Sequence, residues 1–157
     1  MRKVILGAGI TLDGCLARPD GSVDYLHMTK VGAKDFPIAA PTYVFSRTQP
    51  PGERDGVIFT RQSPAAWLRK IRARPGKHSF HMGGGELARS FLQADLIDEL
   101  YLGIVPILLG RGIPFFPAGV PQRDFTLVEN KTYSKSQISL TYRRIRSREN
   151  TKMGKRK

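Results

Sequence analysis

The chain has 157 residues, of which 40% are hydrophobic and 25% are charged, a composition typical of a single globular domain. It contains no run of 18 apolar residues, and the apolar stretch after Met1 is soon interrupted by Gly7 and Gly9. Neither a membrane span nor a secretory signal is therefore predicted, and we expect a cytoplasmic protein with no membrane partner. The single cysteine, Cys15, excludes an intramolecular disulfide and a multi-cysteine metal site, and we predict no bound metal.

More than half of the net charge of +13 lies at the carboxyl end of the chain. Residues 143–157 contain eight basic side chains and one acidic side chain, that of Glu149. Because few apolar residues follow position 145, we predict a single domain over 1–145 and a basic flexible tail over 146–157. The charge leaves a nucleic-acid-associated protein open as an alternative, although no nucleic-acid-binding motif supports it.

Short apolar runs between turn residues predict a succession of strands. Residues 49–52 are predicted as a loop, and 30–41 show no periodicity. At Pro106 we expect a bulge or a sheet edge, because proline has no N–H to donate to a neighbouring strand. The last two strands form a hairpin. The predicted strands cover residues 4–10, 15–17, 43–45, 57–60, 78–82, 100–109, 126–131 and 137–144.

Two helices are predicted among these strands. Ser63 is a favourable N-cap with Pro64 at the first helical position, and this helix ends before Pro75. The second helix runs from about Glu86 to Ala94 and has one apolar face. The alternation of strands and helices predicts an α/β fold with a mostly parallel sheet covered by helices on both faces. The hairpin adds an antiparallel edge.

A run of glycines, Gly83, Gly84 and Gly85, separates a predicted strand from the second helix. Glycine permits positive φ and lets a ligand approach backbone N–H groups, while a helix N-terminus favours an anion. The pattern is typical of a phosphate-binding turn, although a simple strand-to-helix turn also uses glycine. Residues 11–14 and 46–48 follow predicted strands in the same way. Because ligands bind beyond the carboxyl ends of parallel strands, we expect the three segments to form one site.

Several motifs, taken together in order and spacing, resemble the dihydrofolate-reductase-like family. The resemblance is to the branch that contains the C-terminal reductase domain of the bacterial riboflavin-biosynthesis deaminase-reductase. It extends to about Phe116. The motifs are Thr11-Leu12-Asp13-Gly14, Gly21-Ser22-Val23-Asp24-Tyr25, Tyr43-Val44-Phe45-Ser46-Arg47-Thr48, Gly83-Gly84-Gly85-Glu86-Leu87-Ala88, and Asp98-Glu99-Leu100 continuing to Pro106-Ile107-Leu108-Leu109-Gly110-Arg111-Gly112.

This resemblance implies NADPH as the cofactor. It assigns the pyrophosphate to the glycine turn and the start of the helix, and the adenosine 2′-phosphate to the end of the strand before position 46. A guanidinium with neighbouring hydroxyls suits a phosphate dianion, although a solvated strand-end arginine is the alternative for Arg47. The implied cofactor-binding residues are Ser46, Arg47, Thr48, Gly83, Gly84, Gly85, Glu86 and Leu87.

The same resemblance implies a substrate site after the first strand, formed by Thr11, Asp13, Gly14 and Asp24. Asp13 can accept hydrogen bonds from a pyrimidine-like or pterin-like ring, or it can simply stabilise the turn at Gly14. The candidate proton donors are Asp13, His81 and water. His81 is otherwise a structural histidine next to a strand end.

The chain departs from the family pattern in two places. Only 16 residues separate Leu26 from Tyr43, where family members carry another strand and helix with a Gly-Arg-x-Thr motif that touches the cofactor. His81 stands where the riboflavin-pathway reductases place a substrate-contacting glutamate. A shortened sheet should leave an apolar seam, so we expect a homodimer. The seam and a second apolar surface comprise Phe36, Ile38, Tyr43, Val44, Phe45, Ile113, Phe115 and Phe116.

The leading hypothesis is therefore an NADPH-dependent reductase of a small pyrimidine-like or pterin-like substrate. It resembles the 5-amino-6-(5-phosphoribosylamino)uracil reductase of riboflavin biosynthesis. A shortened, non-catalytic module that binds a dinucleotide or another ligand is the first alternative. The basic nucleic-acid-associated protein is the second.

Overall fold

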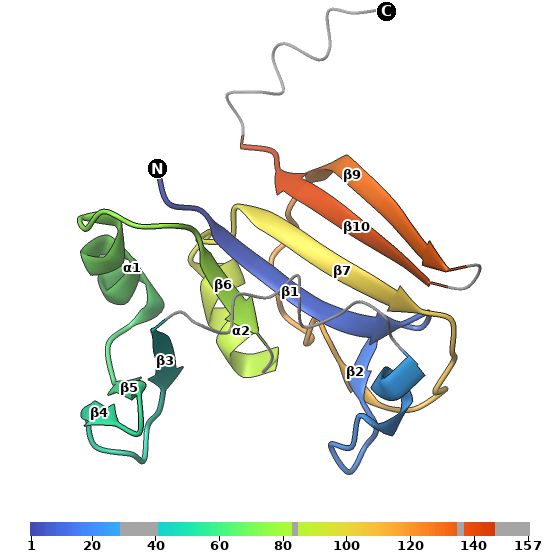
Figure 1. Cartoon of the computed structure of the whole chain (residues 1–157), viewed down its shortest axis with the longest axis horizontal. Helices are drawn as coiled ribbons and strands as arrows, with labels where there is room; N and C mark the ends of the chain where they lie inside the picture. The colour runs from blue at the N-terminus through green and yellow to red at the C-terminus, as the bar shows by residue number, and fades with distance from the viewer. Residues whose placement is uncertain (29–40, 83–84, 135–136, 147–157) are drawn as a thin grey trace, which may run out of the picture.

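The computed structural model describes residues 1–28, 41–82, 85–134 and 137–146, and its centre is a five-stranded sheet (Figure 1). Three strands at one side are parallel, and two strands at the other side form the antiparallel hairpin that the sequence predicts. In spatial order the strands are β6 (Ser79–Met82), β1 (Val4–Thr11), β7 (Glu99–Val105), β10 (Gln137–Arg144) and β9 (Phe125–Ser134).

Two smaller sheets flank this centre. In the first, β3 (Thr42–Phe45) and β5 (Val57–Thr60) are parallel, and β4 (Gly52–Arg54) pairs antiparallel with β5. The prediction of a loop over 49–52 is therefore wrong for its last residue, because β4 begins at Gly52. Asp55 and Gly56, both with positive φ, form the tight turn between β4 and β5, and Asp-Gly is a strong hairpin signal. The second sheet pairs β2 (Cys15–Ala17) with β8 (Ile113–Pro114).

The two helices begin where the sequence predicts. In α1 (Pro64–Arg72), the N–H of Ala66 donates to Ser63 Oγ at 3.3 Å, and such a cap contributes about 1 kcal/mol. Helix α2 (Gly85–Gln93) follows β6, and a short 3₁₀ helix, η1 (Asp24–Met28), follows β2. Strand β7 ends at Val105, immediately before Pro106, which is shorter than the predicted strand over 100–109. Among the described helices, none is long and apolar enough to cross a membrane.

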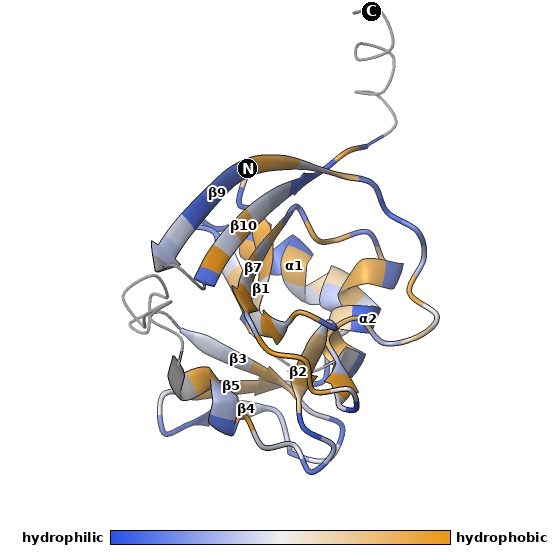
Figure 2. Cartoon of the chain, turned by 90° about the vertical axis from the view of Figure 1, so that its right-hand side faces the viewer, coloured by the Kyte–Doolittle hydropathy of each residue, from blue (hydrophilic) through white to orange (hydrophobic). Residues whose placement is uncertain are grey.

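The hydrophobic core lies between one face of the large sheet and both α-helices (Figure 2). Alternate residues of β1, including Val4 and Leu6, point toward buried Leu68 of α1 and Phe91 of α2. Burying each large apolar side chain contributes roughly 1.5–3 kcal/mol. The expectation of helices on both faces is therefore wrong for the described part of the chain, because α1 and α2 cover the same face.

Aromatic side chains connect the β3–β5–β4 sheet to this core. The Tyr43 and Phe45 rings make edge contacts with Trp67, at centroid distances of 5.3 and 5.5 Å. Phe115 is fully buried. Phe115 therefore packs inward and is not part of the dimer surface expected of it, while Tyr43 and Phe45 are partly buried. Val44, Ile113 and Phe116 are the exposed members of the expected surface, while Phe36 and Ile38 lie outside the described residues.

The opposite face of the sheet is shaped by glycine. A Cβ on Gly7 would lie 2.3 Å from Phe80 Cζ, so only glycine lets the Phe80 ring rest on the backbone of β1. A Cβ on Gly9 would similarly lie 3.0 Å from a methyl carbon of Leu26, next to the 3₁₀ helix. Within the described residues, this face carries no α-helix.

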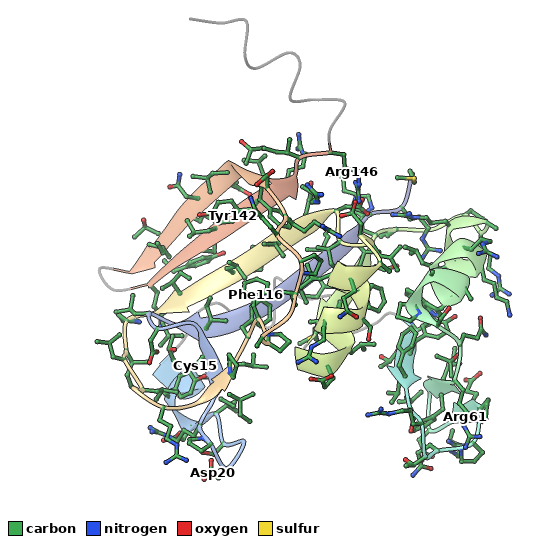
Figure 3. The ribbon with its side chains drawn as sticks, turned by 180° about the vertical axis from the view of Figure 1, so that it is seen from behind. Cys15, Asp20, Arg61, Phe116, Tyr142 and Arg146 are labelled. Carbon is green, nitrogen blue, oxygen red and sulfur yellow. The ribbon has the colours of Figure 1, made fainter. Side chains whose placement is uncertain are left out.

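A network of ion pairs, the Asp98 network, closes the amino-terminal end of β1 and β7. The N–H of Val4 donates to Asp98 Oδ2 at 2.9 Å, and Arg72 Nη2 donates to the same oxygen at 2.8 Å. Arg146 Nη1 donates to Asp98 Oδ1 at 2.9 Å. The boundary placed at 146 is therefore one residue too early, because Arg146 is attached to the domain at the end where the tail leaves (Figure 3).

Candidate functional site

The turn after β1 is held by the side chain of Thr11. Thr11 is buried, and its Oγ1 accepts the N–H of Cys15 at 2.9 Å while donating to Asp13 Oδ1 at 2.5 Å. The N–H of Gly14 donates to the carbonyl of Thr11, and Gly14 has a φ of +75°, which favours glycine. Thr11 and Gly14 thus shape the turn that presents Asp13.

Asp13 connects this turn to the loop that follows β7. Its Oδ2 accepts the N–H of Gly110 at 2.8 Å, and its Oδ1 accepts the N–H of Leu109 at 3.4 Å. The hydrogen bond from Thr11, with further help from these backbone donors, lowers the pKa of the Asp13 carboxyl below its ordinary value of 3.8. Asp13 is therefore ionised at neutral pH. This environment favours a role as hydrogen-bond acceptor over a role as proton donor.

Asp24 lies at the start of the 3₁₀ helix and forms a bidentate ion pair with Arg18. Arg18 Nε donates to Oδ1 at 2.6 Å, and Nη2 donates to Oδ2 at 3.2 Å. Hydrogen bonding to Arg18 lowers the pKa of Asp24. Tyr25 is anchored next to it by donating to the Leu16 carbonyl at 2.7 Å. A substrate that binds Asp24 has to share this carboxylate with Arg18.

Helix α2 begins at Gly85, while Gly83 and Gly84 lie outside the described residues. A Cβ on Gly85 would lie 3.8 Å from the carbonyl oxygen of Pro114, which places this end of α2 beside the segment 113–117. The Glu86 side chain forms an ion pair with Arg89 at 3.2 Å, and this pairing turns its negative charge along the helix. Leu87 packs against the core. Because the Glu86 charge is paired with Arg89, the N-terminus of α2 retains the partial positive charge of the helix dipole.

The segment 113–117 brings two of the three expected parts of the site together. Strand β8 pairs with β2, and the N–H of Phe115 donates to the carbonyl of Gly14 at 3.0 Å. The same segment borders Gly85, as described above. The turn after β1 and the beginning of α2 are therefore neighbours, with one short stretch of chain packed against both.

The third part, the turn after β3, is already ordered by its own hydrogen bonds. Ser46 Oγ accepts the N–H groups of Thr48 at 3.3 Å and of Gln49 at 3.0 Å. Arg61 donates to the carbonyls of Thr48 and Gln49, both at 3.2 Å. Arg47 is exposed. The turn therefore contains one exposed arginine, Arg47, and is held by a second, Arg61; a guanidinium suits a phosphate.

Arg61 is a residue that the sequence analysis missed. It directly follows β5, which runs parallel to β3 with Phe45 opposite Thr60. The carboxyl ends of two parallel neighbours meet at one sheet edge, so the order of the strands could have identified Arg61 as a companion of Ser46. Phe45 contacts Phe91 of α2 at a centroid distance of 5.8 Å, and the small sheet lies beside α2 (Figure 1). No contact joins the 46–48 turn directly to Asp13 or Gly85 among the described residues.

His81 lies on β6 opposite Leu6 and points into the core. The residue is 7% exposed, and its ring centroid is 5.0 Å from that of Phe91. A substrate beyond the strand ends cannot reach a ring that is packed beneath α2. The environment of His81 therefore favours the structural alternative over proton donation.

The sequence model of the RibD C-terminal domain matches residues 38–139. The uncharacterized protein YyaP of Bacillus subtilis (strain 168) is 29% identical over 180 residues, covering 90% of this chain and 94% of that protein. Since 90% of 157 is about 141 residues, roughly 39 of the 180 aligned positions face gaps in this chain. This difference agrees with a chain that is shortened relative to its family.

Two solved structures show the same fold. A putative riboflavin biosynthesis protein from Shewanella sp. PV-4 is similar with a TM-score of 0.78 and 24% identity, covering 92% of this chain and 99% of that one. A diaminohydroxyphosphoribosylaminopyrimidine deaminase/5-amino-6-(5-phosphoribosylamino)uracil reductase from Thermotoga maritima is similar with a TM-score of 0.63 and 16% identity. There the alignment covers 92% of this chain and 57% of that one. The predicted dihydrofolate-reductase-like fold, with its mixed sheet and C-terminal antiparallel strands, is thereby confirmed.

Proposed function

Because the chain belongs to the RibD C-terminal domain family, we propose that it is an NADPH-dependent reductase of a small, flat nitrogen heterocycle, pyrimidine-like or pterin-like. The Thermotoga relative is named as a reductase of 5-amino-6-(5-phosphoribosylamino)uracil, which is a substrate of this class. The observation that carries the proposal is the ordered turn after β3, in which Ser46 Oγ accepts the Gln49 N–H, Arg61 donates to the Thr48 carbonyl, and Arg47 is exposed.

The donors on this chain fit a dinucleotide with phosphates at two places. The guanidinium groups at the β3 turn suit a 2′-phosphate, and the N-terminus of α2 suits a pyrophosphate. NADPH, when bound, supplies the hydride. The chain itself would bind the cofactor and the heterocycle and orient them toward each other.

Asp13 would orient the heterocycle. Its carboxylate is fixed by Thr11 and by the N–H of Gly110, and its lowered pKa keeps it charged at neutral pH. A fixed carboxylate accepts hydrogen bonds from ring N–H or amino groups and so selects one orientation of a pyrimidine or pterin. Orientation of this kind can supply a large part of a rate enhancement. Water is then the remaining candidate for proton delivery, because Asp13 is ionised and His81 is buried.

Calorimetry with NADPH and NADH tests the cofactor assignment. We expect the wild type to bind NADPH more tightly than NADH. Arg47→Ala should lower the affinity for NADPH about tenfold to hundredfold and leave the affinity for NADH unchanged. Arg69→Ala, an exposed arginine on α1, is the control and should change neither affinity. Equal affinities of the wild type for the two dinucleotides would contradict the proposal.

A non-catalytic binding module is the second candidate. It is favoured by the roughly 39 alignment positions that this chain lacks relative to YyaP and by the missing Gly-Arg-x-Thr motif. The two candidates differ in turnover. Consumption of NADPH in the presence of a pyrimidine of the Thermotoga substrate class would support the reductase, whereas Arg47-dependent binding without consumption would support the module.

We also propose a homodimer. The exposed apolar surface that could form its interface is smaller than the one expected from the sequence. Val44, Ile113 and Phe116 are 36, 39 and 38% exposed and are its apolar candidates. Light scattering should report a dimer that Phe116→Lys disrupts. A stable wild-type monomer at micromolar concentration would rule the dimer out.

A further inference from the structure

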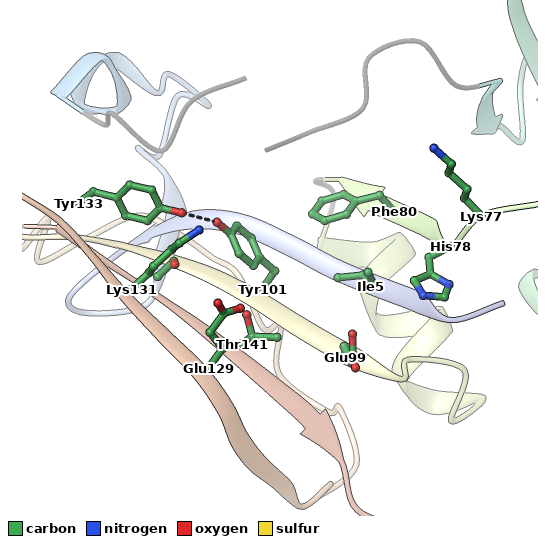
Figure 4. A pocket seen from close by; sticks show the side chains of 11 residues that line it. Ile5, Lys77, His78, Phe80, Glu99, Tyr101, Glu129, Lys131, Tyr133 and Thr141 are labelled. Carbon is green, nitrogen blue, oxygen red and sulfur yellow. Dashed lines mark hydrogen bonds between the residues drawn. The ribbon is translucent and has the colours of Figure 1, made fainter. Parts of the chain in front are cut away.

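The face of the large sheet opposite α1 and α2 contains a hollow of about 610 Å³ (Figure 4). Its apolar floor is formed by Ile5 on β1, Phe80 on β6 and Tyr101 on β7. This volume lies within the range of roughly 300–1,000 Å³ that small-molecule sites occupy. None of the residues assigned above to cofactor or substrate lines the hollow, so the hollow is a separate candidate site.

Aromatic rings give the hollow its shape. Phe80 lies over Gly7, as described above, and its ring makes an edge contact with Tyr101 at a centroid distance of 6.5 Å. Tyr133 of β9 continues this row, because its hydroxyl lies 3.0 Å from that of Tyr101. A hollow lined by aromatic side chains suits an aromatic guest, because ring pairs favour offset-stacked or edge-to-face contacts.

Hydrogen-bonding groups gather at the tyrosine end of the hollow. The hydroxyls of Tyr101 and Tyr133 lie there together with that of Thr141. Lys131 of β9 reaches over the Tyr133 ring, with Nζ 5.9 Å from the ring centroid, and extends toward Tyr101 (Figure 4). A cation beside several hydroxyls is a favourable environment for a carboxylate, sulfonate or phosphate group.

The charges around the hollow favour an anion by a small margin. Glu99 at the floor is neutralised by Lys3 Nζ at 2.6 Å and Arg143 Nε at 3.5 Å. Lys77 and Lys131 have no carboxylate within ion-pair distance among the residues that the structure describes. Glu129, two positions before Lys131, is the opposing negative charge and weakens the attraction.

We propose that this hollow binds a small planar aromatic molecule that carries one anionic group. The ring lies against Phe80 and Tyr101, and the anionic group lies at Lys131 Nζ. The two charged residues on β9 then act in opposite directions, since Lys131 attracts the ligand and Glu129 repels it. This site is independent of the proposed reductase activity.

Fluorescence titration with 8-anilinonaphthalene-1-sulfonate, an aromatic anion, tests the proposal against the neutral N-phenyl-1-naphthylamine. We expect one saturable site that prefers the sulfonate. Lys131→Met should weaken sulfonate binding about fivefold to tenfold, and Glu129→Gln should strengthen it. Lys70→Met, an exposed lysine on α1, removes the same charge from the helix-covered side and should have no effect. Excess NADPH should not displace the probe.

A side chain that fills the hollow provides a second measurement. Thr141→Trp keeps a strand-forming residue on β10 and should abolish binding of both probes while circular dichroism shows an unchanged melt. Unchanged sulfonate affinity in Lys131→Met or in Glu129→Gln would overturn the proposal. Displacement by NADPH would also overturn it. A dimer in sedimentation that Thr141→Trp converts to a monomer would overturn it as well, because a second copy would then cover the hollow.

Discussion

The two ends of the large sheet use their charged residues in different ways. At the amino-terminal end of β1 and β7, Asp98 is 9% exposed in its side chain and is bonded to Val4, Arg72 and Arg146. At the carboxyl-terminal end of β1, Asp13 is exposed. Arg47, in the turn after β3 of the β3–β5–β4 sheet, is exposed as well. Figure 3 shows Arg146 near the amino-terminal end of β1 and Cys15, which lies two residues after Asp13, beyond its carboxyl-terminal end. The first end holds the chain together, while the second leaves charged groups available to a ligand.

The largest expected effect of breaking this arrangement is on stability. Asp98→Ala leaves Arg72 and Arg146 without their carboxylate and removes the acceptor of the Val4 N–H. Breaking a buried ion pair in this way costs about 3–5 kcal/mol, and we expect the lower end because both arginines are partly exposed. Urea unfolding measures the change. Glu53→Ala, on an exposed strand, is the control and should alter stability by less than about 0.5 kcal/mol.

Asp13→Asn gives a smaller effect with a characteristic pH dependence. Asparagine offers one acceptor oxygen in place of the two that bind Thr11, Leu109 and Gly110, so we expect the melting temperature at pH 7 to fall by about 2–4 °C. Because the pKa of Asp13 is lowered in the folded state, its stabilisation is complete above 3.8 and is lost as pH falls through the lowered value. The melting temperatures of wild type and variant should therefore converge only in strong acid. A difference that stays constant from pH 7 to pH 2 would show that the charge is not responsible.

The smallest expected effect is the change in the free energy of unfolding when Arg146, the last residue of the domain, is removed together with the tail. Removing residues 147–157 should leave the free energy of unfolding unchanged. Removing 146–157 also deletes the Arg146 ion pair with Asp98, which is partly exposed, and should cost about 1 kcal/mol. Denaturant titration of the two truncated chains side by side measures the difference. If both are as stable as the full chain, Arg146 belongs to the tail after all.

Local signals in the sequence were sufficient to predict most of the helices and strands. Ser63 with Pro64 marks the start of α1, because a capping side chain and the N–H that it accepts are close together in the chain. The run ending in Gly85 likewise precedes α2 directly. The family motifs identified the family and the fold in the same way. Asp55-Gly56 is a local signal of the same kind for the β4–β5 hairpin, which the predicted strands do not include.

Only the tertiary structure decided which elements face one another. Periodicity shows that α1 and α2 each have an apolar face, but not that both faces pack on the same side of the sheet. It also could not show that His81 lies under Phe91, or that Arg61 joins Ser46 through the pairing of β3 with β5. Arg146 looks like tail in the sequence, since its partner Asp98 is 48 residues away. The hollow likewise depends on side chains from five strands, and contacts of such long range leave no local pattern.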